Sequence, residues 1–232
     1  MTRVTIHQPA YFPWPGYFDK IMRSDIFVYL DTVQLEKNGF VNRNRIRTPE
    51  GRTLWLTVPL IMKEHTQKII KEMQINNSEN WKKKHIKTLE QNYGRTPYFQ
   101  RYFPDLKRLL ESAESDFSAF VFKMLEYFLG VFEIPTRILK SSELNVTSKK
   151  SQLVLDICRE LGADAYFSGA MGSTYLNLPD FEREGIKVEF QEYKCTEYKQ
   201  TGGDFIPGLA VVDLLFNEGA EAGKKLISGG IT

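Results

Sequence analysis

The order of the predicted elements constrains the fold of this chain more than any other feature. Short apolar runs typical of strands alternate with segments of helical periodicity near the amino terminus and again from Thr136 onward. Residues 26–30 form a continuous apolar run, as expected of a strand covered on both faces. Strand–helix–strand units of this spacing imply right-handed crossovers. The sequence therefore predicts an α/β fold with a mainly parallel sheet flanked by helices.

Pattern and turn residues place the individual elements. The predicted strands are residues 4–6, 26–30, 136–139, 165–168 and 186–190, with a helix at 149–161 before the fourth of them. Residues 45–48 and 53–58, joined through Pro49, Glu50 and Gly51, predict a two-stranded hairpin.

The middle of the chain is predicted to be helical. Apolar residues recur with helical spacing over residues 117–129, with Ser115 or Asp116 as the N-cap and Gly130 at the end. Pro97 and Pro104 are expected in the first turns of short helices, where no backbone N–H is needed. We therefore expect a single domain over residues 1–232, in which a helical insertion, residues 77–131, interrupts the sheet.

Composition narrows the class of protein. With 31 basic and 29 acidic residues the net charge is +2, which argues against nucleic acid as the partner. A charged and then apolar leader is missing, as is an apolar run of membrane-spanning length, so we expect a cytoplasmic protein without a membrane partner. Cys158 and Cys195 lack the spacing of metal ligands, and we expect no metal site.

The first predicted strand leads into a loop of polar, aromatic and proline residues. His7 and Gln8 follow the strand, and prolines at positions 9, 13 and 15 stiffen the segment. Tyr11 and Trp14 either stack against a base or sugar ring or belong to the core. His7 either takes part in chemistry or only holds the loop by a hydrogen bond. Lys20, one turn inside the next helix, either reaches back to a bound anion or lies on the surface.

Two further loops are expected at the same edge of the sheet. Asp31 follows the strand at residues 26–30, and Ser168 and Gly169 follow the strand at 165–168. In open parallel sheets, ligands bind beyond the carboxyl ends of the strands, near the point where strand order reverses. The backbone N–H groups of the glycine-containing loop are candidates to hold a phosphate or an oxyanion.

A basic segment before the hairpin is the best anion site by residue type. Asn42, Arg43 and Arg45 offer amide and guanidinium donors that suit phosphate or carboxylate oxygens. The alternative is a solvated turn with charged side chains.

Several of these motifs together resemble a known family. The stretch from His7 to Ile21 resembles the opening signature of the WbqC-like proteins, and further matches cover nearly the whole chain. They are residues 31–34, 42–46, 56–59, Ser168-Gly169 leading to Tyr175-Leu176, and 212–217. The resemblance implies a role beside surface-polysaccharide, O-antigen-type biosynthesis in bacteria, and it implies no particular reaction.

Two classes of function follow. In the first, the protein is a transferase acting on a nucleotide-linked amino sugar or a similar small, phosphate-bearing molecule. His7 is then a general base or phosphate ligand, and Lys20, Arg43 and Arg45 hold phosphates. The layout resembles nucleotidyltransferase-like and Rossmann-like folds, although the second histidine of the nucleotidylyltransferase signature is missing. In the second class, the protein is a non-catalytic ligand-binding or scaffold protein of the same pathway. Cofactors and oligomeric state are left open.

Overall fold

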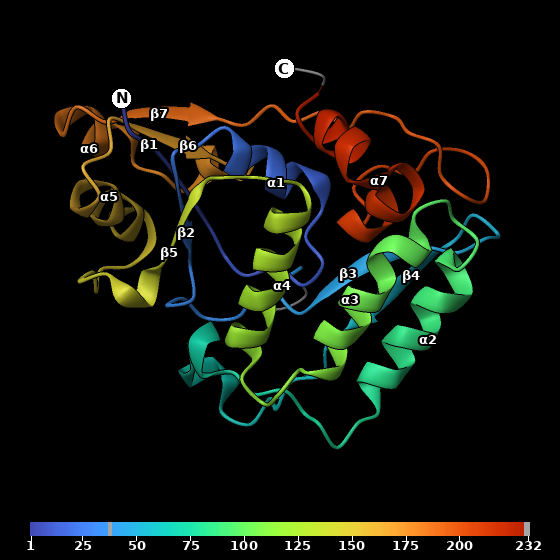
Figure 1. Cartoon of the computed structure of the whole chain (residues 1–232). Coiled ribbons are helices and arrows are strands. Elements are labelled where there is room, and N and C mark those ends of the chain that lie inside the picture. Colours follow the sequence, from blue (N-terminus) through green and yellow to red (C-terminus); the bar gives the residue numbers. More distant parts are fainter. Residues whose placement is uncertain (37–38, 230–232) are drawn as a thin grey trace. The chain divides into compact units, whose positions relative to one another are not determined.

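The structure, a computed structural model drawn in Figure 1, describes residues 1–36 and 39–229. Its internal contacts divide the chain into two compact units. Unit 1 consists of residues 1–8, 19–33 and 134–193, and unit 2 contains the rest of the chain. Within the described residues, none of the helices combines the length and apolar character needed to cross a membrane.

Unit 1 is built on a five-stranded sheet. Its strands are β1 (Arg3–His7), β2 (Ile26–Tyr29), β5 (Arg137–Lys140), β6 (Ala165–Ser168) and β7 (Lys187–Phe190). All neighbouring strands pair in parallel, in the order β5-β2-β1-β6-β7. The expectation of an α/β fold with a mainly parallel sheet is therefore confirmed.

The strand order defines where this sheet has a natural binding edge. The chain begins at the central strand β1, moves outward through β2 to β5, and then returns to add β6 and β7 on the other side. Strand order thus reverses between β1 and β6. Parallel α/β sheets of this kind bind ligands beyond the carboxyl ends of the two strands that flank such a reversal. In unit 1 these ends are His7 and Ser168.

Two helices cover one face of the sheet (Figure 1). They are α5 (Lys150–Glu160) and α6 (Leu178–Arg183), and short 3-10 turns, η3 (Ser141–Glu143) and η4 (Ala170–Thr174), follow β5 and β6. Apolar side chains of β1, β2 and β6 pack against these helices in one core cluster that includes Val4, Ile6, Val28, Ile157, Cys158, Tyr166 and Phe181. Because side chains alternate along a strand, Thr5 and His7 face the other side of the sheet.

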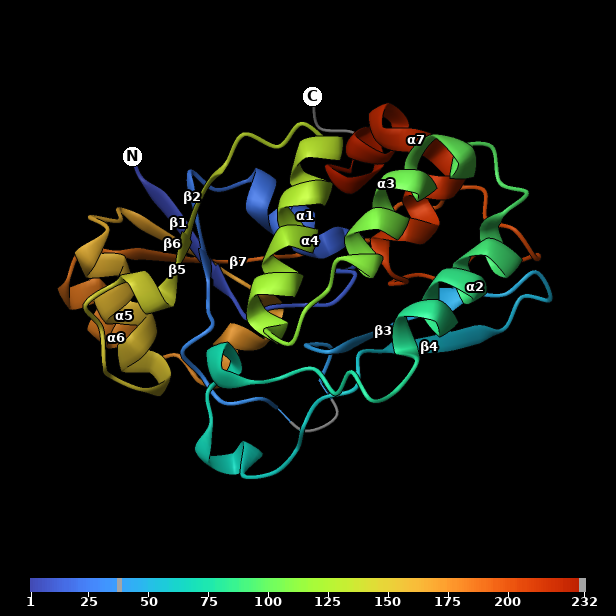
Figure 2. The ribbon, with the colours of Figure 1, turned by 60° about the horizontal axis from the view of Figure 1, so that its bottom comes forward.

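Unit 2 combines helices with a two-stranded antiparallel ribbon, seen in Figure 2. Its helices are α2 (Trp81–Tyr93), α3 (Phe99–Glu111), α4 (Phe117–Val131) and α7 (Val211–Ile227), with 3-10 turns η1 (His65–Gln67) and η2 (Ile70–Glu72). The ribbon consists of β3 (Arg43–Arg47) and β4 (Thr53–Thr57). Helix α1 (Pro15–Met22) begins in unit 2 and ends in unit 1.

Local signals explain where α4 begins but not where it ends. Asp116 caps the helix by accepting a hydrogen bond from the N–H of Ala119 (2.9 Å). The helix then continues through Gly130 to Val131, beyond the predicted end. The prediction for Pro104 was wrong, because this residue lies inside α3 and not in a first turn.

Helix α7 is divided by Gly219, whose φ of 77° and ψ of 178° are not helical. A Cβ atom at this position would lie 2.7 Å from the ring of Tyr98. Glycine therefore satisfies both the backbone conformation and the close approach of the aromatic ring.

A buried polar network holds the ribbon of unit 2 to α7. Asp213, on α7, accepts hydrogen bonds from the hydroxyl groups of Tyr93 and Tyr198, both at 2.7 Å. The hydroxyl of Tyr93 in turn accepts a hydrogen bond from the backbone N–H of Arg47 (3.0 Å). The Arg47 guanidinium donates to Gln200 Oε1 (2.6 Å) and to carbonyl oxygens of the same loop. Asp213 therefore links three segments that are distant in sequence.

Replacing Asp213 by alanine should destabilise the protein by about 3 kcal/mol, because two buried hydroxyl groups lose their acceptor. Urea unfolding monitored by circular dichroism measures the change. Glu221→Ala is the matched control, since that carboxylate lies on the same helix with its side chain 89% exposed. Equal stability of the two variants would contradict a structural role for Asp213.

Candidate functional site

The candidate residues from the sequence are divided between the two units. Unit 1 contains His7, Gln8, Lys20, Asp31, Ser168, Gly169 and Tyr175, and unit 2 contains Tyr11, Trp14, Asn42, Arg43 and Arg45. The convergence of all of them on one ligand stays a prediction, and each set is described by itself.

Lys20 is a buried cation at the carboxyl end of β1. Only 3% of the residue is exposed, and its Nζ donates a hydrogen bond to the carbonyl oxygen of Ile6 (2.9 Å). Burial disfavours the charged form and lowers the pKa of Lys20 from 10.5 to about 7. The amine is thus close to half-protonated at neutral pH, which suits a group that accepts and returns a proton.

His7 lies beside this amine and is held in one tautomer. Its Nδ1 is 3.0 Å from the carbonyl oxygen of Gln8, and because a carbonyl only accepts, this nitrogen carries the proton. Burial, and secondly the charge of Lys20, lower the pKa of His7 to about 3. The imidazole is therefore neutral at pH 7, with Nε2 as its acceptor nitrogen.

The different pKa values of Lys20 and His7 suit the two side chains to different roles. A base with a pKa near 3 removes protons poorly at neutral pH, whereas one near 7 has both the correct protonation state and sufficient strength. Lys20 is therefore the better proton acceptor, and neutral His7 is suited to orient a hydroxyl or amino group by a hydrogen bond.

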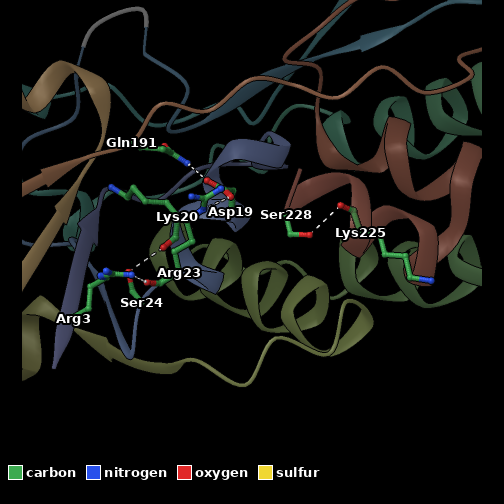
Figure 3. A network of polar contacts seen from close by, with 8 residues as sticks. All are labelled: Arg3, Asp19, Lys20, Arg23, Ser24, Gln191, Lys225 and Ser228. Atoms are coloured by element: carbon green, nitrogen blue, oxygen red, sulfur yellow. Dashed lines mark hydrogen bonds and ion pairs between the residues drawn. The ribbon is translucent and has the colours of Figure 1, made fainter. Parts of the chain in front are cut away.

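The carboxylate next to Lys20 in sequence is occupied by other partners. Asp19, 1% exposed, accepts from Arg23 Nε and from Gln191 Nε2, both at 2.7 Å. Figure 3 shows the Lys20 side chain pointing away from Asp19. Asp19 therefore anchors the end of α1 to the segment after β7 while the Lys20 amine stays at the end of β1.

The loop after β6 is tightly packed. Ser168 is fully buried, its Oγ donates to the carbonyl oxygen of Gly169 (3.1 Å), and its own carbonyl accepts from the N–H of Gln191 (2.8 Å). A Cβ atom on Gly172 would lie 1.9 Å from Ser168 Oγ, so a larger residue at this position would force the Ser168 side chain to move. Tyr175, 53% exposed, follows the turn η4. Ser168 and Gly169 thus shape the edge beside β1.

Asp31 has a structural set of partners in unit 1. One carboxylate oxygen accepts from Ser141 Oγ (2.9 Å) and from the N–H of Ser142 (3.0 Å), and the other accepts from Ser142 Oγ (2.9 Å). These bonds join the loop after β2 to the turn after β5. Asp31 fixes the ends of two neighbouring strands.

In unit 2, Tyr11 lies in the core. It is completely buried, and its hydroxyl lies 2.7 Å from Nδ1 of His85. Burial lowers the pKa of His85 to about 4, so this imidazole is neutral. Trp14 is half-buried just before α1. The amide of Asn42 donates to the carbonyl oxygen of Val58 (2.9 Å) and extends the pairing of the ribbon.

Arg43 and Arg45 project from one face of β3 toward an aromatic side chain of β4. The guanidinium carbon of Arg43 lies 4.5 Å from the ring centre of Trp55, and that of Arg45 lies 5.8 Å away. Arginine over an indole ring is a favourable cation–π arrangement. The sequence predicted the arginines as anion ligands but did not include Trp55.

Metal ligands are not clustered in the part of the chain described here. Within residues 1–36 and 39–229, no group of three or more His, Cys, Asp or Glu side chains is placed to hold a metal ion.

Comparison with known proteins identifies relatives of the whole chain. The WbqC-like protein family matches residues 8–225. The chain belongs to this family. An uncharacterized protein of Mycobacterium tuberculosis (strain ATCC 25618 / H37Rv) is 34% identical over 224 residues, covering 96% of each chain. No solved structure matches the chain at a significant level.

Some residues that shape the site of this WbqC-like protein were missed from the sequence. Asp19 and Gln191 are 172 positions apart, and nothing local in the sequence indicates their pairing. Trp55 carried a usable signal, since the predicted hairpin brings β3 and β4 together and strand alternation selects one face.

Replacing Lys20 by methionine should stabilise the protein at pH 6 and much less at pH 9.5. Folding at low pH requires burial of the ammonium, and because the folded pKa lies below the unfolded one, stability of the wild type rises between about pH 7 and 10.5. The advantage of the variant should therefore shrink by roughly 3 kcal/mol between the two pH values. Urea unfolding at each pH measures this.

Lys187→Met is the control, because the Lys187 side chain is 68% exposed. This variant should show no comparable pH-dependent difference from the wild type. A pH-independent effect of Lys20→Met would contradict the burial of a titrating amine.

Proposed function

We propose that the protein is a transferase acting on a small molecule with a phosphate-linked sugar, such as a nucleotide-linked amino sugar, in surface-polysaccharide biosynthesis. The observation that carries the proposal is the buried amine of Lys20 beside neutral His7 at the carboxyl end of β1. The pathway is what resemblance to the WbqC-like family implies, and the chemistry is argued from this pair of side chains.

The position of the pair supports a role in binding and chemistry. His7 ends β1, and strand order reverses between β1 and β6, where open parallel sheets bind their ligands. A buried lysine is costly to maintain, and strongly perturbed pKa values cluster at functional sites. Among the described residues, Lys20 is the lysine that is buried.

The proposed reaction is a nucleophilic displacement of phosphate. The acceptor hydroxyl or amino group forms a bond to the sugar carbon, the bond from that carbon to the phosphate oxygen breaks, and the phosphate leaves with the bonding electrons. The acceptor proton passes to Lys20 Nζ, while His7 Nε2 orients the acceptor by a hydrogen bond. The negative charge of the leaving phosphate favours the protonated amine and so assists the transfer.

The distribution of exposed apolar side chains does not favour the scaffold alternative. A scaffold role for the helices would be supported by an unpaired apolar face. In the described structure, the large exposed apolar residues lie outside α2, α3 and α4.

Lys20→Met should abolish turnover of phosphate-linked sugars, with a decrease of at least a hundredfold in kcat/KM, because general-base catalysis typically contributes 10²–10⁴-fold. A panel of nucleotide-linked sugars with hydroxyl and amino acceptors is tested by mass spectrometry for release of the nucleotide. Lys20→Arg should not restore activity, because arginine stays protonated. In the wild type, kcat/KM should rise with pH through a pKa near 7.

Lys187→Met is the control and should keep wild-type turnover. Full activity in Lys20→Met, or consumption of no phosphate-linked sugar by the wild type, would overturn the proposal.

A further inference from the structure

One face of the β3–β4 ribbon gathers guanidinium and aromatic side chains that are separated in sequence. In the antiparallel register Arg45 lies opposite Trp55, and Arg43 is the diagonal neighbour of Trp55 on the same face. The ring of Phe40 lies 5.6 Å from that of Trp55. We refer to Phe40, Arg43, Arg45 and Trp55 as the arginine–tryptophan face.

The aromatic members of this face are exposed. Trp55 is 43% exposed and Phe40 is 46% exposed, although both are large apolar residues. Adjacent exposed aromatic side chains are characteristic of binding surfaces. An indole ring with an arginine beside it offers a planar surface on which another ring can stack.

The charge of the ribbon is strongly positive. Residues 43–57 contain four arginines and one glutamate in a chain whose total net charge is only +2. Arg47 is buried and its guanidinium is used by the loop contacts at Gln200, Gly202 and Asp204. Arg45 Nε is buried and has no hydrogen-bond partner among the described residues. A buried donor of this kind is costly unless a ligand pairs with it.

The backbone holds these side chains in a fixed arrangement. The carbonyl oxygen of Arg45 accepts a hydrogen bond from the N–H of Ala210 (2.8 Å), next to α7, while the other edge of β3 pairs with β4. Arg43 and Arg45 are two positions apart on one strand, so their attachment points lie about 7 Å apart. This spacing allows the two guanidinium groups to contact neighbouring phosphates of one ligand.

We propose that the arginine–tryptophan face binds a nucleoside diphosphate group, with the base stacked on Trp55 and the diphosphate held by Arg45 and Arg43. The inference deepens the proposed function and rests on it for the class of ligand, and all the residues that it names belong to unit 2. Phe40 borders the stacked base.

The small number of cations favours a nucleotide over a nucleic acid. Proteins that bind nucleic acid gain much of their affinity by neutralising many backbone phosphates with lysine and arginine. This face offers two arginines beside one central ring. One aromatic ring and two guanidinium groups match a ligand with one base and two phosphates.

The test is calorimetric titration of the full chain with UDP, ADP and GDP, and separately with inorganic pyrophosphate. At least one of the nucleotides should bind more tightly than pyrophosphate and should quench tryptophan fluorescence. Trp55→Leu should weaken nucleotide binding about tenfold or more and remove the quenching, without changing pyrophosphate binding. Arg45→Gln should weaken the binding of both the nucleotide and pyrophosphate.

Two variants serve as controls. Leu54→Ala changes an exposed residue on the opposite face of β4 and should bind nucleotide like the wild type. Trp55→Phe keeps an aromatic ring and should retain most of the affinity. Circular dichroism confirms that each variant is folded. Nucleotide binding that is absent, or unchanged in both Trp55→Leu and Arg45→Gln, overturns the inference.

Failure of this inference is distinguishable from failure of the proposed function. Lys20→Met should still bind nucleotide through the arginine–tryptophan face. If the wild type transfers a phosphate-linked sugar while Trp55→Leu and Arg45→Gln keep wild-type affinity, the inference fails and the function stands. If nucleotide binding depends on Trp55 and Arg45 but Lys20→Met keeps full turnover, the proposed chemistry fails.

Discussion

The burial of the Lys20 amine against the carbonyl oxygen of Ile6 is the interaction on which the candidate site of unit 1 depends. It places a titratable nitrogen at the end of the central strand, and burial brings its pKa to about 7. The same amine helps to keep His7 neutral. Asp19, the nearest carboxylate in sequence, is held by Arg23 and Gln191. Asp19 and Lys20 are consecutive in α1, yet the carboxylate of one and the amine of the other bind different partners.

Two other buried carboxylates, one in each unit, have several hydrogen-bond donors and stabilise the structure around them. Asp31 accepts three hydrogen bonds from Ser141 and Ser142, and Asp213 accepts two from tyrosine hydroxyl groups. Such satisfied groups join distant segments and rigidify them. Lys20 differs, because a backbone carbonyl replaces the carboxylate that a buried lysine normally requires. By this contrast, Asp31 and Asp213 are structural groups, whereas Lys20 is the group suited to proton transfer.

The sequence predicted the helices and strands better than it predicted which side chains pair between distant segments. Alternating apolar runs located the strands, including β6 at residues 165–168, and the prediction of a parallel sheet was correct because strand–helix–strand order constrains topology. Pro104 was misplaced because packing of α3 overrides a local preference. The pairing of Asp31 with Ser141 and Ser142 was not predictable, since it depends on β2 and β5 being neighbours. The environment that perturbs Lys20 likewise exists only after the strands are ordered.

The pairing of β2 with β5 has a consequence for how the chain acquires its structure. Ile26 lies opposite Arg137, so β2 can pair with β5 only after 111 further residues have been synthesised. Most of the intervening chain belongs to unit 2 and contains α2, α3 and α4, of which α2 and α3 contact each other. Closing a long flexible loop costs conformational entropy, and prior folding of the intervening helices shortens the effective loop. We infer that the helices synthesised after β1 and β2 become ordered before the sheet is complete, while β1 and β2, which pair with each other, still lack β6 and β5.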